Sequence, residues 1–461
     1  MSTFTGKLEA FRGRRVLVVG LARSGVAAAK VLAAVAGRVV ACDEKPLAEL
    51  DPAVAALSAA GVDLRPGEQG LDLLDDVDLL VRSPGVPWEL PLVAAAREAG
   101  VEVIGELELG YRLLVTDRLV AITGSNGKST TTALAGEIFR RAGENVVVAG
   151  NIGVALTAAA ADVRSTDVVV VEVSSFQMED AVTFRPRAGV LLNLAPDHLD
   201  RHGDAREYYR LKCRLFENQG ADDFAVLNGD DENVAAAARP RATVLRFSAR
   251  PGAGPGAWLD GDEIKYDVSG AVGILMPAAE VRLPGRHNLM NGMAAACAAL
   301  AMGAPAAACA EALRTFEGLP HRLEDAGEVA GVRYVNDSKA TNVASALTAL
   351  SSYEVPVVLI AGGKGKGEDF RPLAQAAAAK VRLAVLYGAA RADLAAAFEG
   401  AVAVALAETV EEAVREAAAA AHAGDVVLLS PACTSWDQYN NFEERGDEFK
   451  RVVAALRREV E

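Results

Sequence analysis

The sequence has few cysteines, few aromatic residues and no concentrated positive charge. Its five cysteines are scattered over 461 residues, and none belongs to a Cys-x-x-Cys pair. This pattern is typical of a reducing compartment and argues against a disulfide framework or a structural zinc site. Acidic residues outnumber basic ones, so the net charge is −15, and no Lys/Arg block occurs. We therefore expect no nucleic-acid partner, and the acidic excess serves solubility.

Long hydrophobic segments are also scarce. Residues 1–15 contain no apolar core before the basic run Arg12–Arg15, so we predict no signal peptide. The longest uncharged run, 293–310, is mostly alanine and is interrupted by Gly303 and Pro305, which favours buried helices over a membrane span. These features predict a cytoplasmic chain without membrane insertion, which we expect to be a monomer.

Apolar residues make up 51% of the chain and aromatic residues only 5%, as in a compact, alanine-rich α/β protein. At roughly 150 residues per domain, the length predicts three domains. We predict a Rossmann-like N-terminal domain (1–106), a central P-loop domain with a mainly parallel sheet (107–318) and a Rossmann-like C-terminal domain (319–461).

The segment Ala121–Thr132 is the strongest local signal. An apolar run, a turn containing Gly124 and Gly127, and a helix beginning at Lys128 follow one another. Backbone N–H groups and a helix N-terminus can then face an anion, Lys128 adds charge, and a hydroxyl can reach Mg²⁺. Ile122 replaces the first glycine of the usual P-loop pattern, so an ordinary glycine-rich turn remains the alternative.

Two further strand ends of the central domain carry chemistry-bearing side chains. Glu172 ends the apolar strand 167–172 and is predicted to bind Mg²⁺, with a helix cap or salt bridge as the alternative. The strand 188–193 leads into Pro196–His202, a dense set of metal- or phosphate-competent residues. A lone histidine is more often structural, but this setting favours a functional His198.

The N-terminal domain begins with the strand Arg15–Val19, a turn, a helix and a second strand ending at Asp43. This is a Rossmann-like opening, in which such an acid usually holds a ribose hydroxyl. Ala22 replaces the middle glycine, which disfavours NAD and leaves a differently held nucleotide or a structural turn. The turn Ser83–Gly85 ends another strand, 77–83, where ligands bind in open α/β sheets.

The helix predicted for 205–218 packs through Tyr208, Leu211 and Leu215, at positions i, i+3 and i+7. Lys212 lies at the edge of this apolar stripe. The spacing alone therefore predicts a solvated lysine.

The C-terminal domain shows four apolar strands, 333–335, 357–361, 384–387 and 425–429, each followed by a polar or glycine-rich turn. This arrangement predicts a doubly wound parallel sheet.

Three α/β domains with one P-loop indicate ATP in the middle and a different ligand on each flank. ATP-driven joining of two molecules follows naturally from this layout. A switch GTPase is disfavoured because the chain has no Asn-Lys-x-Asp motif. A non-catalytic nucleotide-dependent switch or scaffold remains the alternative from another class.

Several motifs together carry a resemblance to one family: Thr123–Thr130, Glu172–Gln177, Asn193 with Asp197–Asp200, Gly285–Asn288, Pro320–Arg322 and Asn336–Lys339. The chain resembles the Mur ligases of peptidoglycan precursor synthesis and, more distantly, folylpolyglutamate synthase. Its segment Leu429–Gly446 resembles the D-glutamate-adding branch of that family. Another Mur-type or folylpolyglutamate-type ligase is the alternative within ligases.

The resemblance implies an ATP-dependent carboxylate–amine ligase with small-molecule substrates. ATP would phosphorylate the carboxylate of UDP-N-acetylmuramoyl-L-alanine, and the amine of D-glutamate would attack the acyl phosphate. Positioning and neutralisation of oxygen charge by Lys128 and Mg²⁺ should supply most of the catalysis.

The resemblance also implies the roles of individual residues. The catalytic residues are Lys128, His198 and Lys212. Two Mg²⁺ sites draw on Ser129, Glu172, His198 and Lys212, the last as an N-carbamate. ATP is expected to contact Gly124, Ser125, Asn126, Gly127, Lys128, Ser129, Thr130, Asn288, Arg322 and Asp337. The UDP-substrate is expected to contact Leu21, Ala22, Asp43, Glu44, Lys45, Ser83, Pro84, Gly85 and Asn151. D-Glutamate is expected to contact Lys339, Thr341, Lys366, Ser435, Trp436 and Phe442.

Overall fold

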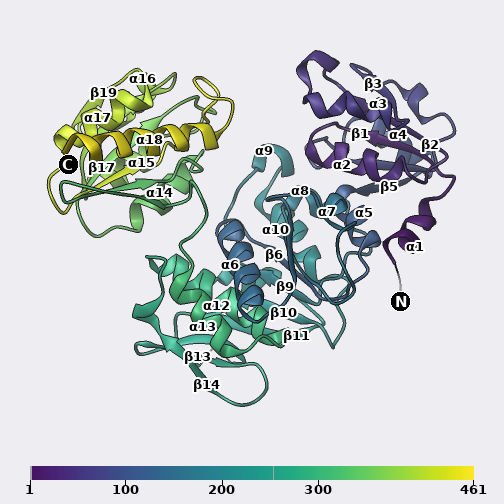
Figure 1. The fold of residues 1–461 in the computed structure, drawn as a ribbon, viewed down its shortest axis with the longest axis horizontal. Helices are drawn as coiled ribbons and strands as arrows, with labels where there is room; N and C mark the ends of the chain where they lie inside the picture. The colour runs from purple at the N-terminus through teal and green to yellow at the C-terminus, as the bar shows by residue number, and fades with distance from the viewer. Residues whose placement is uncertain (1–2, 253, 461) are drawn as a thin grey trace. The chain divides into compact units, whose positions relative to one another are not determined.

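The computed structural model describes residues 3–252 and 254–460, and these form three β-sheets with helices on their faces (Figure 1). Each sheet is largely parallel and is built from its own stretch of chain, which confirms the predicted three-domain α/β fold. The chain packs as two compact units, Met1–Arg282 with His287–Phe316, and Leu283–Arg286 with Glu317–Glu461. The first unit holds two of the sheets and the second holds one.

The N-terminal sheet is entirely parallel, in the order β3-β2-β1-β4-β5. Its strands are β1 (Arg15–Val19), β2 (Arg38–Asp43), β3 (Asp63–Pro66), β4 (Leu79–Arg82) and β5 (Glu102–Gly105). Its helices are α1 (Phe4–Leu8), α2 (Arg23–Leu32), α3 (Ala56–Ala59) and α4 (Pro91–Glu98), with 3₁₀ turns η1 (Glu9–Phe11), η2 (Leu47–Glu49), η3 (Pro52–Val54) and η4 (Leu71–Leu74). The strand order reverses between β1 and β4, which is where open α/β sheets form ligand crevices.

The middle sheet has the order β14-β13-β12-β11-β10-β9-β6-β8-β7, parallel from β7 to β12 and antiparallel beyond. Its strands are β6 (Leu119–Thr123), β7 (Val146–Gly150), β8 (Val168–Glu172), β9 (Ala188–Leu191), β10 (Phe224–Asn228), β11 (Thr243–Ser248), β12 (Gly256–Asp260), β13 (Glu263–Asp267) and β14 (Gly273–Pro277). Its helices are α5 (Glu106–Leu113), α6 (Lys128–Arg141), α7 (Leu156–Ala159), α8 (Ser175–Met178), α9 (Leu199–His202), α10 (Ala205–Cys213), α11 (Glu232–Ala237), α12 (Arg286–Ala301) and α13 (Ala306–Thr315), with 3₁₀ turns η5 (Arg214–Phe216) and η6 (Ala278–Glu280).

The third sheet has the order β15-β16-β20-β17-β18-β19, with only β15 antiparallel to its neighbour. Its strands are β15 (Glu324–Val329), β16 (Val332–Asn336), β17 (Val357–Gly362), β18 (Val381–Tyr387), β19 (Val404–Leu406) and β20 (Val426–Leu429). Its helices are α14 (Val343–Ser351), α15 (Arg371–Ala377), α16 (Arg391–Phe398), α17 (Val410–Ala420) and α18 (Phe442–Val460).

The first two domains share one apolar core. Val120 and Ile122 of β6 pack with α6, α12 and α13, whereas Ala121 joins the cluster on the opposite face. That cluster continues through Leu107 of α5 to Val16 of β1 in the N-terminal domain. A continuous core explains why the two domains form a single compact unit.

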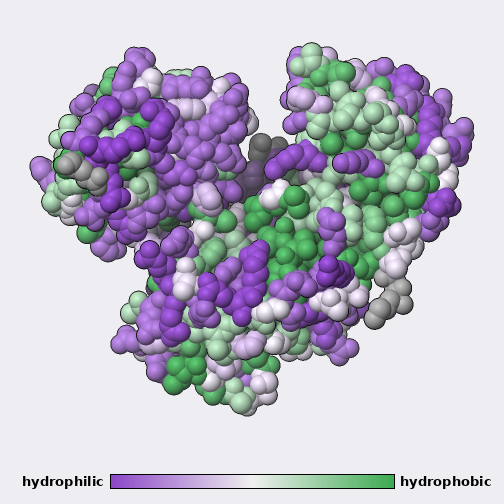
Figure 2. Space-filling view, in the orientation of Figure 1, coloured by the Kyte–Doolittle hydropathy of each residue, from purple (hydrophilic) through white to green (hydrophobic). Residues whose placement is uncertain are grey.

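Helices cover both faces of the third sheet. Apolar residues of α14, α15 and α16 pack on one face, and those of α17 and α18 pack on the other. Hydrophilic residues predominate on the surface of this domain that Figure 2 shows.

No helix in the described ranges is long and apolar enough to span a membrane. The alanine-rich run 293–310 divides between α12 and α13, which are separated by Gly303 and Pro305 as expected.

Candidate active site

The loop between β6 and α6 forms a tight cradle at the C-terminal edge of the middle sheet. Gly124 (φ 155°) and Gly127 (φ 84°) have positive φ angles that disfavour side chains. A Cβ at Gly127 would also lie 2.3 Å from Asn291 Oδ1 on α12. Lys128 begins α6, and its Nζ donates to the carbonyl oxygens of Gly124 (2.9 Å) and Ser125 (2.8 Å). The turn therefore presents a helix N-terminus and a lysine at one point, as predicted.

The cradle is fastened to the loop that follows β9. Ser125 N donates to Asn193 O, and Asn126 N donates to Asn193 Oδ1 at 2.8 Å. Ser125 Oγ donates to Ala195 O at 2.8 Å and accepts from Ala195 N at 2.9 Å. These bonds fix the loop before any ligand arrives, and sequence reasoning assigned no such role to Asn193.

Glu172 lies at the tip of β8, the strand next to β6. Its Oε1 accepts a hydrogen bond from Asn151 Nδ2 at 2.7 Å, while its Oε2 is buried without a partner in the described chain. A buried oxygen without a donor is unfavourable alone, so this carboxylate fits a hard cation. The described residues contain no group of three or more His, Cys, Asp or Glu side chains suited to a metal. Mg²⁺ commonly takes only one or two carboxylates and completes its shell with phosphate and water.

Lys212 is only 1% exposed, so the prediction of a solvated lysine is wrong. Its Nζ donates to Gly124 O at 2.9 Å and lies 4.6 Å from the centre of the Tyr208 ring. Burial, and next the charge of Lys128, lowers the pKa of Lys212 well below its usual value. The helical stripe did not reveal this because the P-loop, distant in sequence, covers this side of α10.

Further predicted ATP and metal residues of the first unit lie near the cradle. Ser129 and Thr130 are each 4% exposed in the first turn of α6. Asn288 is buried on α12, where Asn291 Nδ2 donates to its Oδ1 at 3.3 Å, and Asn291 also adjoins Gly127. His198 precedes α9 with φ 52°, its side chain is 50% exposed, and its ring centre lies 4.9 Å from that of Phe176.

Three turns of the N-terminal domain meet where its strand order reverses. Asp43 Oδ2 accepts from Leu21 N at 2.7 Å, and its Oδ1 accepts from Lys45 N at 3.0 Å. Ser83 Oγ donates to Gly20 O at 2.7 Å. Most of the predicted UDP-substrate residues are thus gathered here, namely Leu21, Ala22, Asp43, Glu44, Lys45, Ser83, Pro84 and Gly85. Asn151 instead lies beside Glu172 in the middle domain.

A buried ion cluster joins the first two domains and was not predicted. Arg82, with no exposed surface, has Nη2 at 2.6 Å from both Glu179 Oε2 and Asp180 Oδ2. Burial raises the pKa of Asp180 to about 6 despite this pairing. We call Arg82, Glu179, Asp180 and Arg201 the domain seam. In the sequence, the charged residue Arg82 at the end of the apolar strand β4 could have indicated this cluster.

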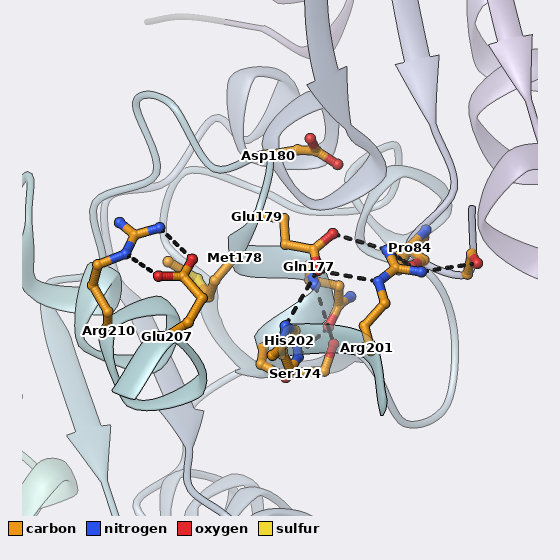
Figure 3. Close-up of polar contacts among 12 residues, drawn as sticks. Pro84, Ser174, Gln177, Met178, Glu179, Asp180, Arg201, His202, Glu207 and Arg210 are labelled. Carbon is orange, nitrogen blue, oxygen red and sulfur yellow. Dashed lines mark hydrogen bonds and ion pairs between the residues drawn. The ribbon is translucent and has the colours of Figure 1, made fainter. Parts of the chain in front are cut away.

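Arg201 of α9, the fourth residue of the domain seam, also contacts the turn that follows β4 (Figure 3). Its Nη2 donates to Glu179 Oε2 at 2.9 Å and to Val86 O at 2.9 Å. It also bonds the carbonyl oxygens of Pro84 and Gly85. The turn predicted to hold the UDP-substrate is therefore tied to the short helix that His198 precedes.

In the third domain, the buried Asp337 and the half-buried Arg322 lie on two turns that are joined by a hydrogen bond from Leu323 N to Asp337. Asp337 accepts hydrogen bonds from Ser430 Oγ (3.0 Å) and Leu323 N (3.2 Å). Burial raises its pKa to about 7, against the opposing charge of Arg322. Arg322 Nε is buried without a hydrogen-bond partner in the described chain. Both groups retain capacity to bind a polar ligand.

The residues predicted for the amino acid lie at one edge of the third sheet. They come from the turns after the adjacent strands β16, β20 and β17 and from the start of α18, and they are Lys339, Thr341, Lys366, Ser435, Trp436 and Phe442. Lys339 Nζ lies 5.4 Å from the centre of the Phe442 ring. Lys366 is exposed, Ser435 is buried, and Trp436 is 68% exposed, which leaves its ring in solvent.

Comparison with known proteins matches family models to all three domains. The model described as "Mur ligase MurD-like, N-terminal domain" matches residues 14–105, "Mur ligase middle domain" matches 122–299, and "Mur ligase, glutamate ligase domain" matches 321–433.

Two curated relatives match almost end to end. The UDP-N-acetylmuramoylalanine–D-glutamate ligase of Pelotomaculum thermopropionicum is 46% identical over 98% of this chain and 100% of its own length. The enzyme of the same name from Alkaliphilus metalliredigens is 40% identical over 97% of this chain and 99% of its own.

Solved structures support the fold alone. The UDP-N-acetylmuramate–alanine ligase MurC of Thermotoga maritima has a TM-score of 0.60 at 18% identity, over 96% of this chain and 99% of that one. A MurF ligase of the same organism, solved with ADP, has a TM-score of 0.59 at 15% identity, over 91% and 95%.

Proposed function

The chain belongs to the Mur ligase family, and we propose that it is the ATP-dependent ligase that joins D-glutamate to UDP-N-acetylmuramoyl-L-alanine. Relatives with that name align over nearly the whole chain. The observation that carries the proposal is the P-loop cradle, where Lys128, Lys212 and Glu172 converge beside a fixed turn. The third domain adds lysines and a hydroxyl suited to a dicarboxylate.

The reaction begins when the γ-phosphoryl group of ATP passes to the carboxylate of the UDP-substrate, giving an acyl phosphate and ADP. The amine of D-glutamate attacks the acyl carbon and loses a proton, and phosphate departs as the amide forms. Lys128 moves from its loop carbonyls to the transferred phosphoryl group and balances the charge of its oxygens. We assign residues 124–130 to the phosphate chain, which would face the N-terminus of α6, while the N–H groups of Ser125 and Asn126 donate to Asn193 and keep the loop in shape.

We assign Ser129, Glu172 and His198 to two Mg²⁺ sites, together with Lys212 in modified form. The partnerless Glu172 Oε2 supports this assignment. Bound Mg²⁺ would draw together and neutralise phosphate oxygens.

Lys212 is proposed to carry an N-carbamate. The neutral amine is the form that attacks CO₂, and burial favours that form by lowering the pKa of Lys212. The carbamate replaces a cation close to Lys128 by an anion with two oxygens, which are the ligands Mg²⁺ prefers.

Lys212→Ala should be nearly inactive and should regain activity with short carboxylic acids that occupy the same place. In the wild-type protein, ¹³CO₂ should give a carbamate carbon signal by NMR that the variant lacks. Full activity of the variant in buffer free of CO₂ and carboxylic acids would contradict the modification.

The remaining ligand contacts follow the strand ends. We propose that the gathered turns of the N-terminal domain hold the uridine side and that Asn151 contacts the sugar or pyrophosphate. Asn288 and Arg322 are assigned to the nucleotide, and Asp337 is assigned to its ribose. The six residues at the edge of the third sheet are assigned to D-glutamate. We further propose a cytoplasmic monomer with domain borders near residues 106 and 318.

Phosphate release measured against a panel of amino acids tests the function. Release should require both UDP-N-acetylmuramoyl-L-alanine and an amino acid, and D-glutamate should be preferred. ATP hydrolysis that ignores both substrates would favour a nucleotide-dependent switch, and preference for another amino acid would favour a different ligase.

A further inference from the structure

Arg445 of α18 has no exposed surface and lies beneath the edge of the third sheet where the amino acid is proposed to bind. Its Nε donates to Ser338 Oγ at 2.9 Å, and its Nη2 donates to Ser338 O at 2.7 Å. Its Nη1 lies within hydrogen-bond reach of three oxygens, Cys433 O (3.1 Å), Gly362 O (3.4 Å) and Tyr387 Oη (3.4 Å). Every one of these acceptors is a neutral oxygen.

Four of these five contacts are made to the three turns that carry proposed D-glutamate residues. Ser338 precedes Lys339, Gly362 opens the turn that contains Lys366, and Cys433 lies two residues before Ser435. The chain positions differ widely, but β16, β20 and β17 are neighbours in the sheet. One guanidinium therefore holds three turns in a fixed relation.

Two further contacts add to the way in which Arg445 fixes these turns. Ser338 Oγ, which accepts from Arg445 Nε, donates to Phe442 O at 2.8 Å, so the first residue of α18 joins the network. Gly363 has φ 121°, and a Cβ there would lie 3.0 Å from Arg445 Nη1 and 2.2 Å from Thr434 O. The glycine lets the turn approach the guanidinium closely.

The charge of Arg445 is not matched by an ion pair. Within the described residues, no carboxylate contacts the guanidinium. Asp337 senses this charge, but burial raises the pKa of Asp337 to about 7 and keeps it partly neutral. An arginine remains protonated at any physiological pH. No contacting carboxylate therefore pairs with the guanidinium, and an anionic ligand would help to balance its charge.

We propose that Arg445 is the positioning residue of the amino-acid site, setting the three turns for a dicarboxylate and supplying the buried positive charge that its carboxylates balance. This inference rests on the proposed function, since it concerns the site assigned to D-glutamate. Arg445 acts through Lys339, Lys366, Ser435 and Phe442 and does not itself touch the substrate, because its side chain is enclosed.

A purely structural arginine would behave differently when changed. Loss of packing would lower the melting temperature and affect all substrates alike. A positioning role predicts a selective rise in the KM for D-glutamate, with smaller effects on the KM values for ATP and the UDP-substrate. The two roles are therefore separated by comparing three KM values in one variant.

The first test uses Arg445→Lys and Arg445→Gln. Lysine keeps the charge but offers three donors in place of a planar fork, so its KM for D-glutamate should rise about tenfold, from the loss of one charged hydrogen bond. Glutamine also removes the charge, and its KM should rise about a hundredfold. Equal changes in all three KM values, or unchanged values, would overturn the proposal.

A second variant guards against misfolding at position 445. Ser338→Ala deletes the hydroxyl that links Arg445 to Phe442 and should raise the KM for D-glutamate about fivefold. Ser430→Ala is the matched control, because it deletes an equally buried hydroxyl that donates to Asp337. That control should change the KM for ATP instead. The reverse pattern, or no difference between the two serines, would contradict the role of Arg445.

The wild-type assay distinguishes a failure of the proposed function from a failure of the role assigned to Arg445. If the unmodified chain does not use D-glutamate, the proposed function fails, and this inference fails with it. If the wild type uses D-glutamate but the variants bind it normally, the inference about Arg445 fails alone.

Discussion

Arg82 and Arg445 are both fully buried arginines at the C-terminal edge of a parallel sheet, but their surroundings differ. Arg82 lies between the carboxylates of Glu179 and Asp180 in the domain seam. Arg445 contacts only neutral oxygens in the described chain. A compensated charge can hold two folded parts together, whereas an uncompensated one is better suited to await an anionic ligand.

The two lysines at the P-loop resemble Arg445, because they also donate to carbonyl oxygens. Lys212 donates to Gly124 O, and Lys128 donates to Gly124 O and Ser125 O. Substrates for these positions carry phosphates and carboxylates. The chain thus places buried or partly buried cations against carbonyl oxygens where anions are proposed to bind, and against carboxylates where domains join.

The largest effect is expected at the P-loop. Lys128→Ala removes the cation that faces the transferred phosphoryl group, so turnover should fall by about 10³-fold or more while the protein stays folded. Steady-state kinetics and circular dichroism would measure the two properties. Lys265→Ala, which removes a lysine paired with Asp260 on the β12–β13 hairpin, is the control and should remain active. Near-normal ligation by Lys128→Ala would place this lysine outside the chemistry.

The domain seam should respond in stability instead of substrate binding. Arg82→Met leaves the buried carboxylate of Asp180 without its cation and leaves Glu179 paired with Arg201, so the free energy of unfolding should fall by about 3–5 kcal/mol. Chemical denaturation would measure this, and the KM for D-glutamate of the folded fraction should not change. Arg141→Met breaks a more exposed pair with Glu137 and Glu311 and should lower the stability far less. Equal losses of stability in Arg82→Met and Arg141→Met would show that the buried cluster stabilises the protein no more than the exposed ion pair does.

A smaller effect is expected at the exposed end of the amino-acid site. Lys366→Ala should raise the KM for D-glutamate by about tenfold, through loss of one charged contact, and should leave the KM for ATP unchanged. Lys364→Ala provides the matched control, since this exposed lysine lies two residues earlier in the same turn. A parallel rise in both KM values would point to a general disturbance of the domain.

The smallest effect is a pH dependence. Burial raises the pKa of Asp337 to about 7, so in the free protein this carboxyl is protonated below that pH and ionised above it. The ionised form is the better acceptor for ribose hydroxyls, so the KM for ATP should fall several-fold as the pH rises through 7. Asp337→Asn should lose this dependence. A pH-independent KM in the wild type would argue against the contact between Asp337 and the ribose.

The sequence predicted the central strands better than the edges of the sheets. Strands β6 and β8 are continuous apolar runs because both faces are covered, so their patterns were clear. The edge strand β15, Glu-Asp-Ala-Gly-Glu-Val, lies partly in solvent and carries no apolar run. The sequence predicted no strand at these residues. Edge strands gain their hydrogen bonds from a neighbour that is distant in sequence, which local patterns do not report.

In the candidate site, too, the sequence predicted the local features and missed those that depend on residues distant in sequence. The cradle at Gly124–Lys128 is a local motif, and its geometry followed from spacing. The burial of Lys212 and the network around Arg445 depend on segments about 90 to 110 residues away, so no periodicity could reveal them. Family resemblance identified Lys212, but Arg445 stood unassigned within the motif Leu429–Gly446.

Oxygen transfer from the substrate carboxylate tests the central claim most directly. UDP-N-acetylmuramoyl-L-alanine labelled with ¹⁸O in its carboxylate would be incubated with ATP and D-glutamate, and the released phosphate analysed by mass spectrometry. An acyl phosphate intermediate predicts one labelled oxygen in each phosphate, with label appearing only when the amide forms in the presence of D-glutamate. Unlabelled phosphate would show that ATP is hydrolysed by water, and it would contradict the proposed ligase mechanism.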